Sequence, residues 1–290
     1  MKQVRPKKNL GQHFLTDLEI ARRIADTVDA CPTLPVLEVG PGMGVLTQFL
    51  AEKQRPLSVV EIDAESVAYL KERFPEFRGY EGTEVRGCED SSGAASDLVP
   101  PHPRTPAPPI IEGDFLRMDL HALVDGGQFV LTGNYPYDIS SQIFFKMLDN
   151  RDLIPCCTGM IQHEVAQRMA AQPGSKQYGI LSVLIQAWYD VEYLFTVPPS
   201  VFNPPPKVMS AVIRMTRNSV QHLGCDEQLF RRIVKTTFNQ RRKMLRVSLR
   251  QLLPPDAPFF ADNADLLTRR PEQLTIPEFV NLTNLVANTL

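Results

Sequence analysis

The chain has 290 residues, of which 43% are hydrophobic and 22% are charged, and its formal net charge is −2 at pH 7. This length and composition indicate a globular protein with one large domain and a smaller one. The small net charge excludes a uniformly basic nucleic-acid binder, although charges can still be segregated along the chain.

Cysteine usage and hydropathy indicate where the protein works. The chain has 5 cysteines, an odd number, and none of them forms a Cys-x-x-Cys pair. We therefore expect neither a disulfide framework nor a metal site, and a reducing cytoplasm fits best. The basic N-terminus lacks the apolar core of a signal peptide, and no apolar run is long enough to span a bilayer. We expect a cytoplasmic monomer without membrane association.

Apolar periodicity predicts alternating helices and strands in the first half of the chain. The predicted elements, in order, are a helix over about 17–29, a strand over 36–39, a helix through 46–50, a strand over 57–62, a helix over 64–74, a strand ending at 110–114, a strand over 129–132 and a helix over 140–148. Strands that alternate with helices form a parallel sheet covered on both faces, which predicts an α/β fold.

The pattern changes after residue 178. The predicted elements beyond it are an apolar segment over 180–185, strands over 191–197 and 210–215, and helices from about 218, of which the strongest runs from 230 to 252. Pro254 ends that helix. We therefore expect a domain boundary near residue 217, with a large α/β domain over residues 1–217 and a small all-helical domain over 218–290.

Residues 79–109 interrupt the link between the second helix and the third strand. The segment is rich in glycine, proline, serine and alanine, and few of its residues could enter a core. We predict a surface insertion that is largely disordered.

Polar residues follow several predicted strands at the points where the strands end. Residues 38–44, Glu61, Asp114 and Asn134 all lie at such ends. Ligands of open α/β sheets bind beyond the carboxyl ends of the strands. The sequence therefore predicts one ligand site formed by these residues.

Glu38-x-Gly40-x-Gly42-x-Gly44 is a glycine-rich turn between a strand and a helix, where a ligand can approach the backbone closely. Its spacing differs from the Gly-x-Gly-x-x-Gly of dinucleotide folds. Glu61 lies about 20 residues on, where an acid takes a ribose diol, and Asp114 can accept from an adenine amino group. A glycine turn followed by an acid at this spacing fits a binding site for NAD or for S-adenosylmethionine. A ligand without a pyrophosphate suits a turn that has no Lys or Arg nearby.

The tetrad Asn134-Tyr135-Pro136-Tyr137 suits a flat base with an exocyclic amine. The Asn134 side-chain oxygen can accept one N–H, a backbone carbonyl beside Pro136 can accept the other, and Tyr137 can stack on the ring. Taken alone, the tetrad is more typical of a structural turn than of a binding site.

Basic residues gather in two segments. Lys2, Arg5, Lys7 and Lys8 precede the first acid, and residues 231–250 contain many cations and no acid. Such clusters are either solvated surface or contacts to RNA phosphates, and the absence of acids favours RNA.

With these motifs in place, the chain resembles the ribosomal RNA small-subunit adenine N6,N6-dimethyltransferases over nearly its whole length. The matching segments are residues 8–15 (KNLGQHFL), 37–44 (LEVGPGMG), 60–63 (VEID), 113–114 (GD), 133–140 (GNYPYDIS), 202–208 (FNPPPKV) and 238–245 (FNQRRKML). The family usually has Leu where Tyr135 stands, and residues 79–109 are a larger departure.

The resemblance implies a Rossmann-like class I methyltransferase domain that uses S-adenosylmethionine as methyl donor and no metal. The implied cofactor-binding residues are Gln12, His13, Leu15, Glu38, Gly40, Gly42, Gly44, Glu61, Asp114 and Asn134. Gln12 and His13 would hold the methionine end of the donor. Glu61 would bind its ribose hydroxyls and Asp114 its adenine.

The resemblance also implies the acceptor. The target would be two adjacent adenosines in the 3′-terminal hairpin loop of 16S rRNA, in the 30S subunit or its precursor, with a role in 30S biogenesis. The residues implied to hold the target adenine are Asn134, Pro136, Tyr137 and Phe202, and Phe202 would close on its second face. The expected RNA-binding residues are Lys7, Lys8, Lys207, Arg241, Arg242, Lys243 and Arg246.

Three other functions are weighed against this one. A 23S rRNA adenine methyltransferase of the antibiotic-resistance type would share the glycine turn and the tetrad, although residues 238–245 fit the small-subunit enzymes better. A ribosome-assembly factor would act mainly by binding. A nicotinamide-dependent oxidoreductase is disfavoured, because the glycine spacing is wrong and the tetrad would have no task.

Overall fold

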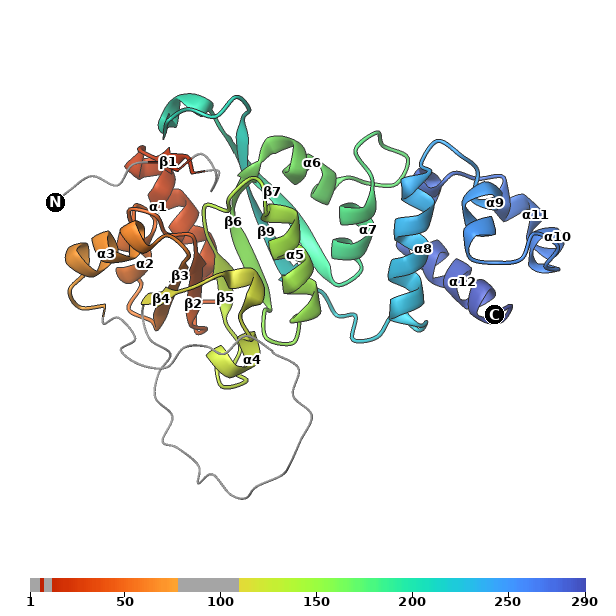
Figure 1. Cartoon of the computed structure of the whole chain (residues 1–290), viewed down its shortest axis with the longest axis horizontal. Helices are drawn as coiled ribbons and strands as arrows, with labels where there is room; N and C mark the ends of the chain where they lie inside the picture. The colour runs from red at the N-terminus through yellow and green to blue at the C-terminus, as the bar shows by residue number, and fades with distance from the viewer. Residues whose placement is uncertain (1–5, 8–11, 78–109) are drawn as a thin grey trace, which may run out of the picture. The chain divides into compact units, whose positions relative to one another are not determined.

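The computed structural model describes residues 6–7, 12–77 and 110–290 (Figure 1). The chain divides into two compact units: Met1–Gln162 with Leu194–Arg214, and His163–Tyr193 with Met215–Leu290. The second unit thus includes two helices that precede residue 217. The functional boundary expected near that residue stays a prediction, and Lys8 and the segment 79–109 lie outside the described residues.

A seven-stranded sheet has the strand order β4-β3-β2-β5-β6-β9-β7. The strands are β2 (Val36–Val39), β3 (Leu57–Glu61), β4 (Ile110–Glu112), β5 (Val130–Thr132), β6 (Cys156–Gln162), β7 (Tyr189–Val197) and β9 (Ser210–Arg217). The pairs β2–β3, β2–β5, β3–β4 and β5–β6 are all parallel, so their carboxyl ends meet at one edge. The predicted α/β class is confirmed, and β6 is a strand that the sequence did not predict.

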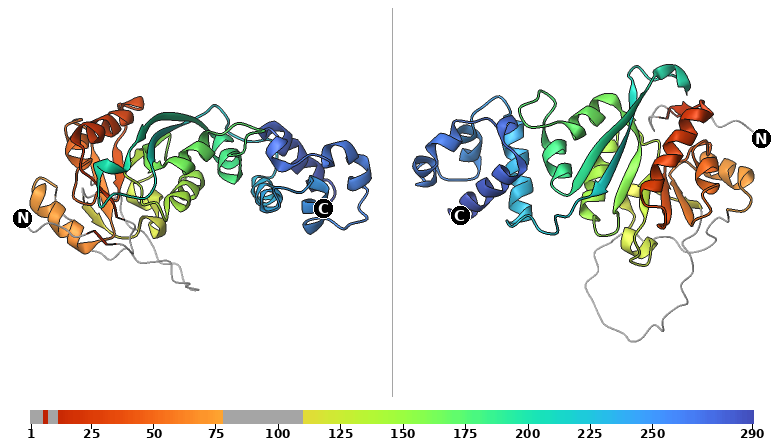
Figure 2. Two further views of the ribbon diagram at one scale, coloured as in Figure 1. Left: turned by 90° about the horizontal axis from the view of Figure 1, so that it is seen from above. Right: turned by 180° about the vertical axis from the view of Figure 1, so that it is seen from behind.

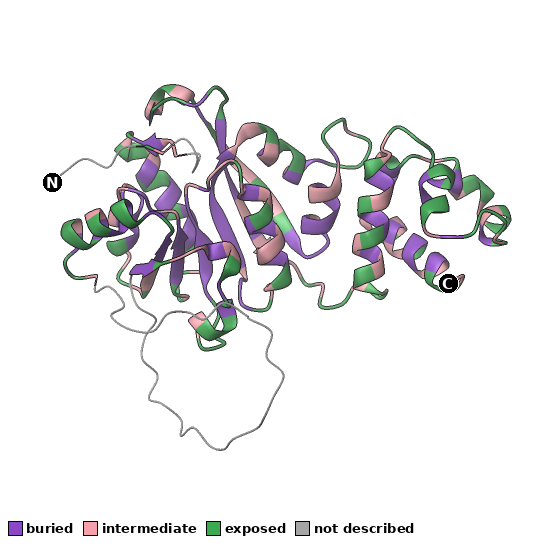
Figure 3. Ribbon diagram, viewed as in Figure 1, coloured by how far each residue is buried: buried purple, intermediate pink, exposed green. Residues whose placement is uncertain are grey.

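Helices lie on both faces of the sheet (Figure 2). The helical elements of the first unit are α1 (Leu18–Asp26), η2 (Thr27–Ala30), α2 (Thr47–Ala51), α3 (Ala64–Arg73), η3 (Phe115–Arg117), α4 (Leu120–Leu123) and α5 (Ser140–Asp149), with η4 (Pro199–Val201) later. Asp17 and Asp63 begin α1 and α3 by accepting hydrogen bonds from backbone N–H groups of the first turn. The strands β2, β5 and β6 are buried almost throughout, whereas β7 is mostly half-buried or exposed (Figure 3).

A small two-stranded sheet joins the N-terminal segment (residues 12–16) to the Pro-rich segment (residues 197–208). Strand β1 (Phe14–Leu15) pairs antiparallel with β8 (Phe202–Asn203), so that Leu15 lies opposite Phe202. The Thr16 backbone N–H extends this pairing by donating to the Val201 carbonyl at 2.8 Å. Residues far apart in the sequence are thereby brought beside the carboxyl edge of the sheet.

The second unit is helical around an aromatic core. Its elements are α6 (His163–Ala170), α7 (Ile180–Gln186), α8 (Glu227–Asn239), α9 (Leu245–Ser248), η5 (Leu249–Gln251), α10 (Phe259–Asp262), α11 (Ala264–Leu267), η6 (Pro271–Gln273) and α12 (Ile276–Ala287). Trp188 packs edge-on against Phe230, and Phe238 packs against Phe279. No helix among the described residues is long and apolar enough to cross a membrane.

The single helix predicted over 230–252 is wrong. Helix α8 ends at Asn239, and a turn follows in which Lys243 N–H donates to the Gln240 carbonyl at 2.7 Å. The reason is burial: Phe238 and Leu245 are buried, whereas the polar residues between them are not. Since no side chain between these two residues is buried, tertiary packing does not support a further helical turn.

Candidate active site

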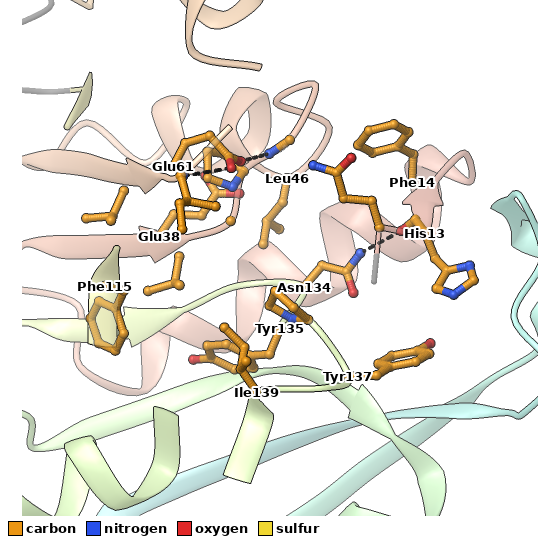
Figure 4. Close-up of a pocket in the computed structure, with 18 of the residues that line it drawn as sticks. His13, Phe14, Glu38, Leu46, Glu61, Phe115, Asn134, Tyr135, Tyr137 and Ile139 are labelled. Atoms are coloured by element: carbon orange, nitrogen blue, oxygen red, sulfur yellow. Dashed lines mark hydrogen bonds between the residues drawn. The ribbon is translucent and has the colours of Figure 1, made fainter. Parts of the chain in front are cut away.

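A cavity of about 240 Å³ opens at the carboxyl edge of the sheet (Figure 4). Its walls come from the ends of β2, β3 and β5, the loop after β4, and the N-terminal segment. The predicted site residues that line it are Gln12, His13, Leu15, Glu38, Gly40, Gly42, Glu61, Asp114, Asn134, Pro136 and Tyr137. The structure therefore brings nearly all of them together, while Gly44 and Phe202 are not among its lining residues.

Two glycines of the turn are required for different reasons. Gly40 has φ +68°, a backbone conformation that residues with a side chain rarely adopt, and a Cβ built on it would make an ordinary contact with the Pro136 ring at 3.8 Å. Gly44 is required for packing, because a Cβ there would lie 2.4 Å from the Phe74 ring. The turn therefore passes close to Pro136 of the tetrad.

Glu61 fastens the glycine turn to the end of β3. Its side-chain oxygens accept from the backbone N–H groups of Gly42 at 3.0 Å and of Ile62 and Asp63 at 2.9 Å. Burial raises the pKa of Glu61, and these hydrogen bonds partly offset that rise. A carboxylate has about four acceptor sites, so one remains for a further donor such as a hydroxyl.

Glu38 is a second buried carboxyl group in the cavity wall. It is 1% exposed and accepts a hydrogen bond from Thr47 Oγ1 at 2.7 Å. The pKa of Glu38 is raised to about 8, chiefly by burial; the Thr47 hydrogen bond opposes this rise, and the nearby Glu61 adds to it. Glu38 is therefore largely protonated at neutral pH when no cation lies near it.

Asp114 caps the loop after β4. Its Oδ1 accepts from the Leu116 N–H at 2.9 Å, and its Oδ2 lies 3.4 Å from Arg117 Nε. Two apolar residues that the sequence reasoning missed, Ile62 and Phe115, also line the cavity, and Ile62 is 53% exposed. Each of them directly follows an acid at a strand end, Glu61 or Asp114, and this position was the sequence signal that could have identified them.

The charged residues of the cavity wall all have one sign. Among the described lining residues the acids are Glu38, Glu61, Asp114 and Asp138, and no Lys or Arg is present. The site suits a cationic or neutral ligand with hydrogen-bond donors and disfavours a pyrophosphate.

Asn134 is oriented by the N-terminal segment. Its Nδ2 donates to the His13 carbonyl at 3.2 Å, as the dashed line in Figure 4 shows. Since a carbonyl can only accept, this contact assigns the amide orientation and leaves Oδ1 as the acceptor for a ligand. The Pro136 carbonyl accepts from Ile139 N–H at 3.3 Å and keeps capacity for a second donor.

Tyr137 stands beside Asn134 with its ring against His13. The two ring centroids are 5.5 Å apart with an interplanar angle of 28°, and the Tyr137 hydroxyl hydrogen-bonds to Ser210 Oγ. Burial raises the pKa of Tyr137, so the phenol is neutral at physiological pH. The ring can therefore act by stacking.

Tyr135 belongs to the core behind the site. It is 1% exposed, its hydroxyl donates to the Thr158 carbonyl at 2.8 Å, and its ring contacts Phe144 edge-on. Two glycines bring the backbones close here: a Cβ on Gly133 would lie 2.5 Å from the Val39 carbonyl oxygen, and one on Gly159 would lie 2.3 Å from the Gly133 carbonyl oxygen. The buried tyrosine satisfies its own hydroxyl, which explains why it is accepted here.

Phe202 lies in the core beneath the cavity. It is 4% exposed and packs in a cluster with Leu15 and Ile24. Closure of this ring on the target base stays a prediction, and it would require movement of the Pro-rich segment.

The expected RNA-binding residues lie in different surroundings. Lys7 Nζ lies 2.5 Å from the buried Asp63 and 3.5 Å from Glu65, whereas Lys207 is exposed. The ammonium of Lys7 thus has carboxylate partners that compete with phosphate, and its RNA contact stays a prediction.

The turn after α8 carries the remaining expected RNA contacts. Arg241 is half-buried, and its Nη2 donates to the Ser175 carbonyl at 3.0 Å, which fixes the loop between α6 and α7. Arg242, Lys243 and Arg246 are exposed, and no ion pair among the described residues involves them. Lys176 follows Ser175 and is also exposed, so it joins these cations as a candidate that sequence reasoning missed.

Comparisons with known protein sequences show the family of this chain. The chain matches the family described as ribosomal RNA adenine dimethylase over residues 3–81 and 102–284. It is 61% identical to the ribosomal RNA small subunit methyltransferase A of Bacteroides thetaiotaomicron, over 100% of this chain and 97% of that protein. The protein of the same name from Flavobacterium johnsoniae is 45% identical over 99% and 97% of the two chains.

Solved structures show the same fold. A dimethyladenosine transferase from Plasmodium falciparum has a TM-score of 0.71 at 23% identity, covering 96% of this chain and 98% of that one. The 23S rRNA methyltransferase ErmE has a TM-score of 0.59 at 25% identity, covering 92% and 99%. Fold and site together define a class I S-adenosylmethionine-dependent methyltransferase with a helical C-terminal part. Within that class, the chain belongs to the ribosomal RNA adenine dimethylase family.

Proposed function

We propose that the protein transfers methyl groups from S-adenosylmethionine to N6 of two adjacent adenosines in the 3′-terminal hairpin loop of 16S rRNA, giving N6,N6-dimethyladenosine. Its partner is the 30S subunit or its precursor, and methylation accompanies 30S biogenesis in the cytoplasm, with the protein acting as a monomer. The observation that carries the proposal is that residues of the glycine turn and of the tetrad line one cavity.

The described residues fit S-adenosylmethionine in shape and charge. Glu61 has one acceptor site left for a ribose hydroxyl, and Asp114, which lines the same cavity, would accept from the adenine amino group. A cationic ligand draws the proton from Glu38, because a nearby positive charge lowers a carboxyl pKa. Gln12 and His13, in the N-terminal wall, would hold the methionine end. No metal ligand is included in the proposal.

The acceptor amine needs help, since its lone pair is delocalised into the adenine ring. S-adenosylmethionine supplies an electrophilic methyl group whose carrier leaves as a neutral thioether. Asn134 Oδ1 and a carbonyl beside Pro136 would accept the two N–H hydrogens. These contacts would aim the nitrogen lone pair at the methyl group of the donor. Tyr137 would hold the ring by stacking. Orientation and electrostatics supply most of the acceleration in such a site.

The amine must lose a proton after it is methylated. Pairing of the N–H groups with neutral acceptors delays that loss until the nitrogen carries positive charge, when its acidity is high. Asn134 therefore acts as an orienting acceptor and no strong general base is assigned.

RNA recognition is assigned to cations outside the cavity. Arg242, Lys243, Arg246 and Lys176 are exposed and would contact phosphates, with Arg241 holding the loop that carries Lys176. Phosphate contacts position a nucleic acid without reading its sequence, so the choice of adenosine falls to the tetrad.

The decisive experiment compares undermethylated 30S subunits, 50S subunits and free 16S rRNA as methyl acceptors, followed by mapping of the modified adenines. We expect two adjacent dimethylated adenosines in the 3′-terminal hairpin of 30S-borne rRNA. Methylation of 50S particles instead would favour the activity named for ErmE. Tight 30S binding without methyl transfer would favour an assembly factor.

A further inference from the structure

Tyr137 is held on two sides by residues of the chain itself. Its hydroxyl hydrogen-bonds to Ser210 Oγ, and its ring stacks on the His13 imidazole. His13 is fixed in turn, because its Nδ1 lies 2.8 Å from the Pro204 carbonyl, which can only accept. The orientation of the Tyr137 ring is therefore set without RNA.

Ser210 contributes a hydroxyl for which the proposed chemistry has no other use. It is the first residue of β9 and is 0% exposed. A buried hydroxyl needs a hydrogen-bond partner, and its partner here is the Tyr137 phenol. Alanine would fit the same strand position without that need, so the strand alone does not explain a serine.

We propose that Ser210 is a positioning residue for methyl transfer, which fixes the Tyr137 ring in the plane on which the target adenine stacks. The inference rests on the proposed function, in which Tyr137 stacks on that base. A misplacement of about 1 Å in a reacting group costs on the order of a hundredfold in rate. Loss of the Ser210 contact alone should cost less, since His13 still supports the ring.

A double-mutant cycle tests the proposal. Ser210→Ala, Tyr137→Phe and the double variant are compared for kcat on undermethylated 30S subunits and for the Kd of S-adenosylmethionine. Each single variant should lower kcat about fivefold to tenfold and leave the donor Kd unchanged. The double variant should be no slower than Tyr137→Phe alone, because both changes remove the same contact.

Two results overturn the proposal. The first is a reduction in kcat of the double variant that equals the product of the two single reductions. The second is an unchanged kcat in Tyr137→Phe. The second result decides the matter even where Ser210→Ala fails to fold. Thr283→Val is the control, since it removes a buried hydroxyl that donates to the Phe279 carbonyl at 2.8 Å in α12, and its kcat should equal that of the parent chain.

Failure of the proposed function has a separate signature, namely no methyl transfer by the parent chain to any ribosomal acceptor. Ser210 is then tested with an RNA hairpin that carries 2-aminopurine at the target position. Stacking on Tyr137 should quench its fluorescence in the parent chain and less in Ser210→Ala and Tyr137→Phe. Equal quenching in all three overturns the proposal.

Discussion

The cavity at the carboxyl edge of the sheet and the turn after α8 carry opposite charges. The described cavity wall has Glu38, Glu61 and Asp114 and no Lys or Arg, whereas the turn exposes Arg242 and Lys243 without acids beside them. RNA phosphates are repelled by the first region and attracted by the second. An acidic cavity can therefore admit a neutral RNA base while it repels the RNA phosphate groups.

Asn134→Ala is expected to give the largest effect, because it removes the oriented acceptor for the adenine amine. Methyl transfer should be abolished, a fall of at least about a hundredfold in kcat, while S-adenosylmethionine binds nearly as before. Single-turnover assays and calorimetric titration of the donor measure the two quantities. An equal loss of donor affinity would show that Asn134 serves the donor instead.

Arg242→Ala and Lys243→Ala should act on RNA alone. Each removes one phosphate contact, so RNA affinity should fall uniformly across sequences and the salt slope of log K should drop by about 1 per residue. Donor affinity should not change. Arg22→Ala is the matched control, because this arginine pairs with Glu52 at 2.9 Å in the first unit. A salt slope unchanged in the turn variants would contradict the assignment.

Glu38→Gln should change the pH dependence of stability. The unfolded chain ionises this residue above about 4.5, whereas the folded chain keeps it protonated up to about 8. The unfolded state therefore binds fewer protons between these pH values, and the free energy of unfolding falls as pH rises. The variant should show a shallower fall in urea titrations. Some slope should persist, because the pKa of Glu61 is also raised. If the unfolding free energy of the variant and of the parent chain fell equally with pH, the assignment of Glu38 as buried and protonated would be contradicted.

Tyr135→Phe should have the smallest effect. It removes the hydrogen bond to the Thr158 carbonyl and leaves the ring packing on Phe144. The free energy of unfolding should fall by about 1 kcal/mol, with kcat unchanged. Denaturant titration and the 30S assay check both values. A large loss of kcat would place Tyr135 in the chemistry.

The strand ends were predictable because apolar runs stop at polar residues. The strands around Glu38 and Glu61 and the tetrad lie where the sequence predicts them. Strand β6 was missed, since its residues Cys156–Gln162 lack strand alternation and include Gly159, which is unfavourable within a strand. The helix over 230–252 was predicted too long because neither Gly nor Pro interrupts the sequence before Pro254, whereas α8 ends at Asn239.

Partners within the site were less predictable than its residues. Nothing local in the sequence indicates that Lys7 pairs with Asp63 or that Arg241 holds Ser175, because these contacts join distant segments. Phe202 is another case: the pairing of β1 with β8 places it in the core. Long-range pairing decides such details, and single-sequence patterns do not report it.

Gly133 and Gly159 allow the backbones of neighbouring strands to approach closely behind the tetrad. A methyl group at either position would lie within 2.5 Å of a backbone oxygen of a neighbouring strand end. Neither glycine is assigned to a ligand, yet each allows this close approach because it has no side chain. Substitution at these two positions is therefore restricted by backbone separation rather than by the chemistry of the site.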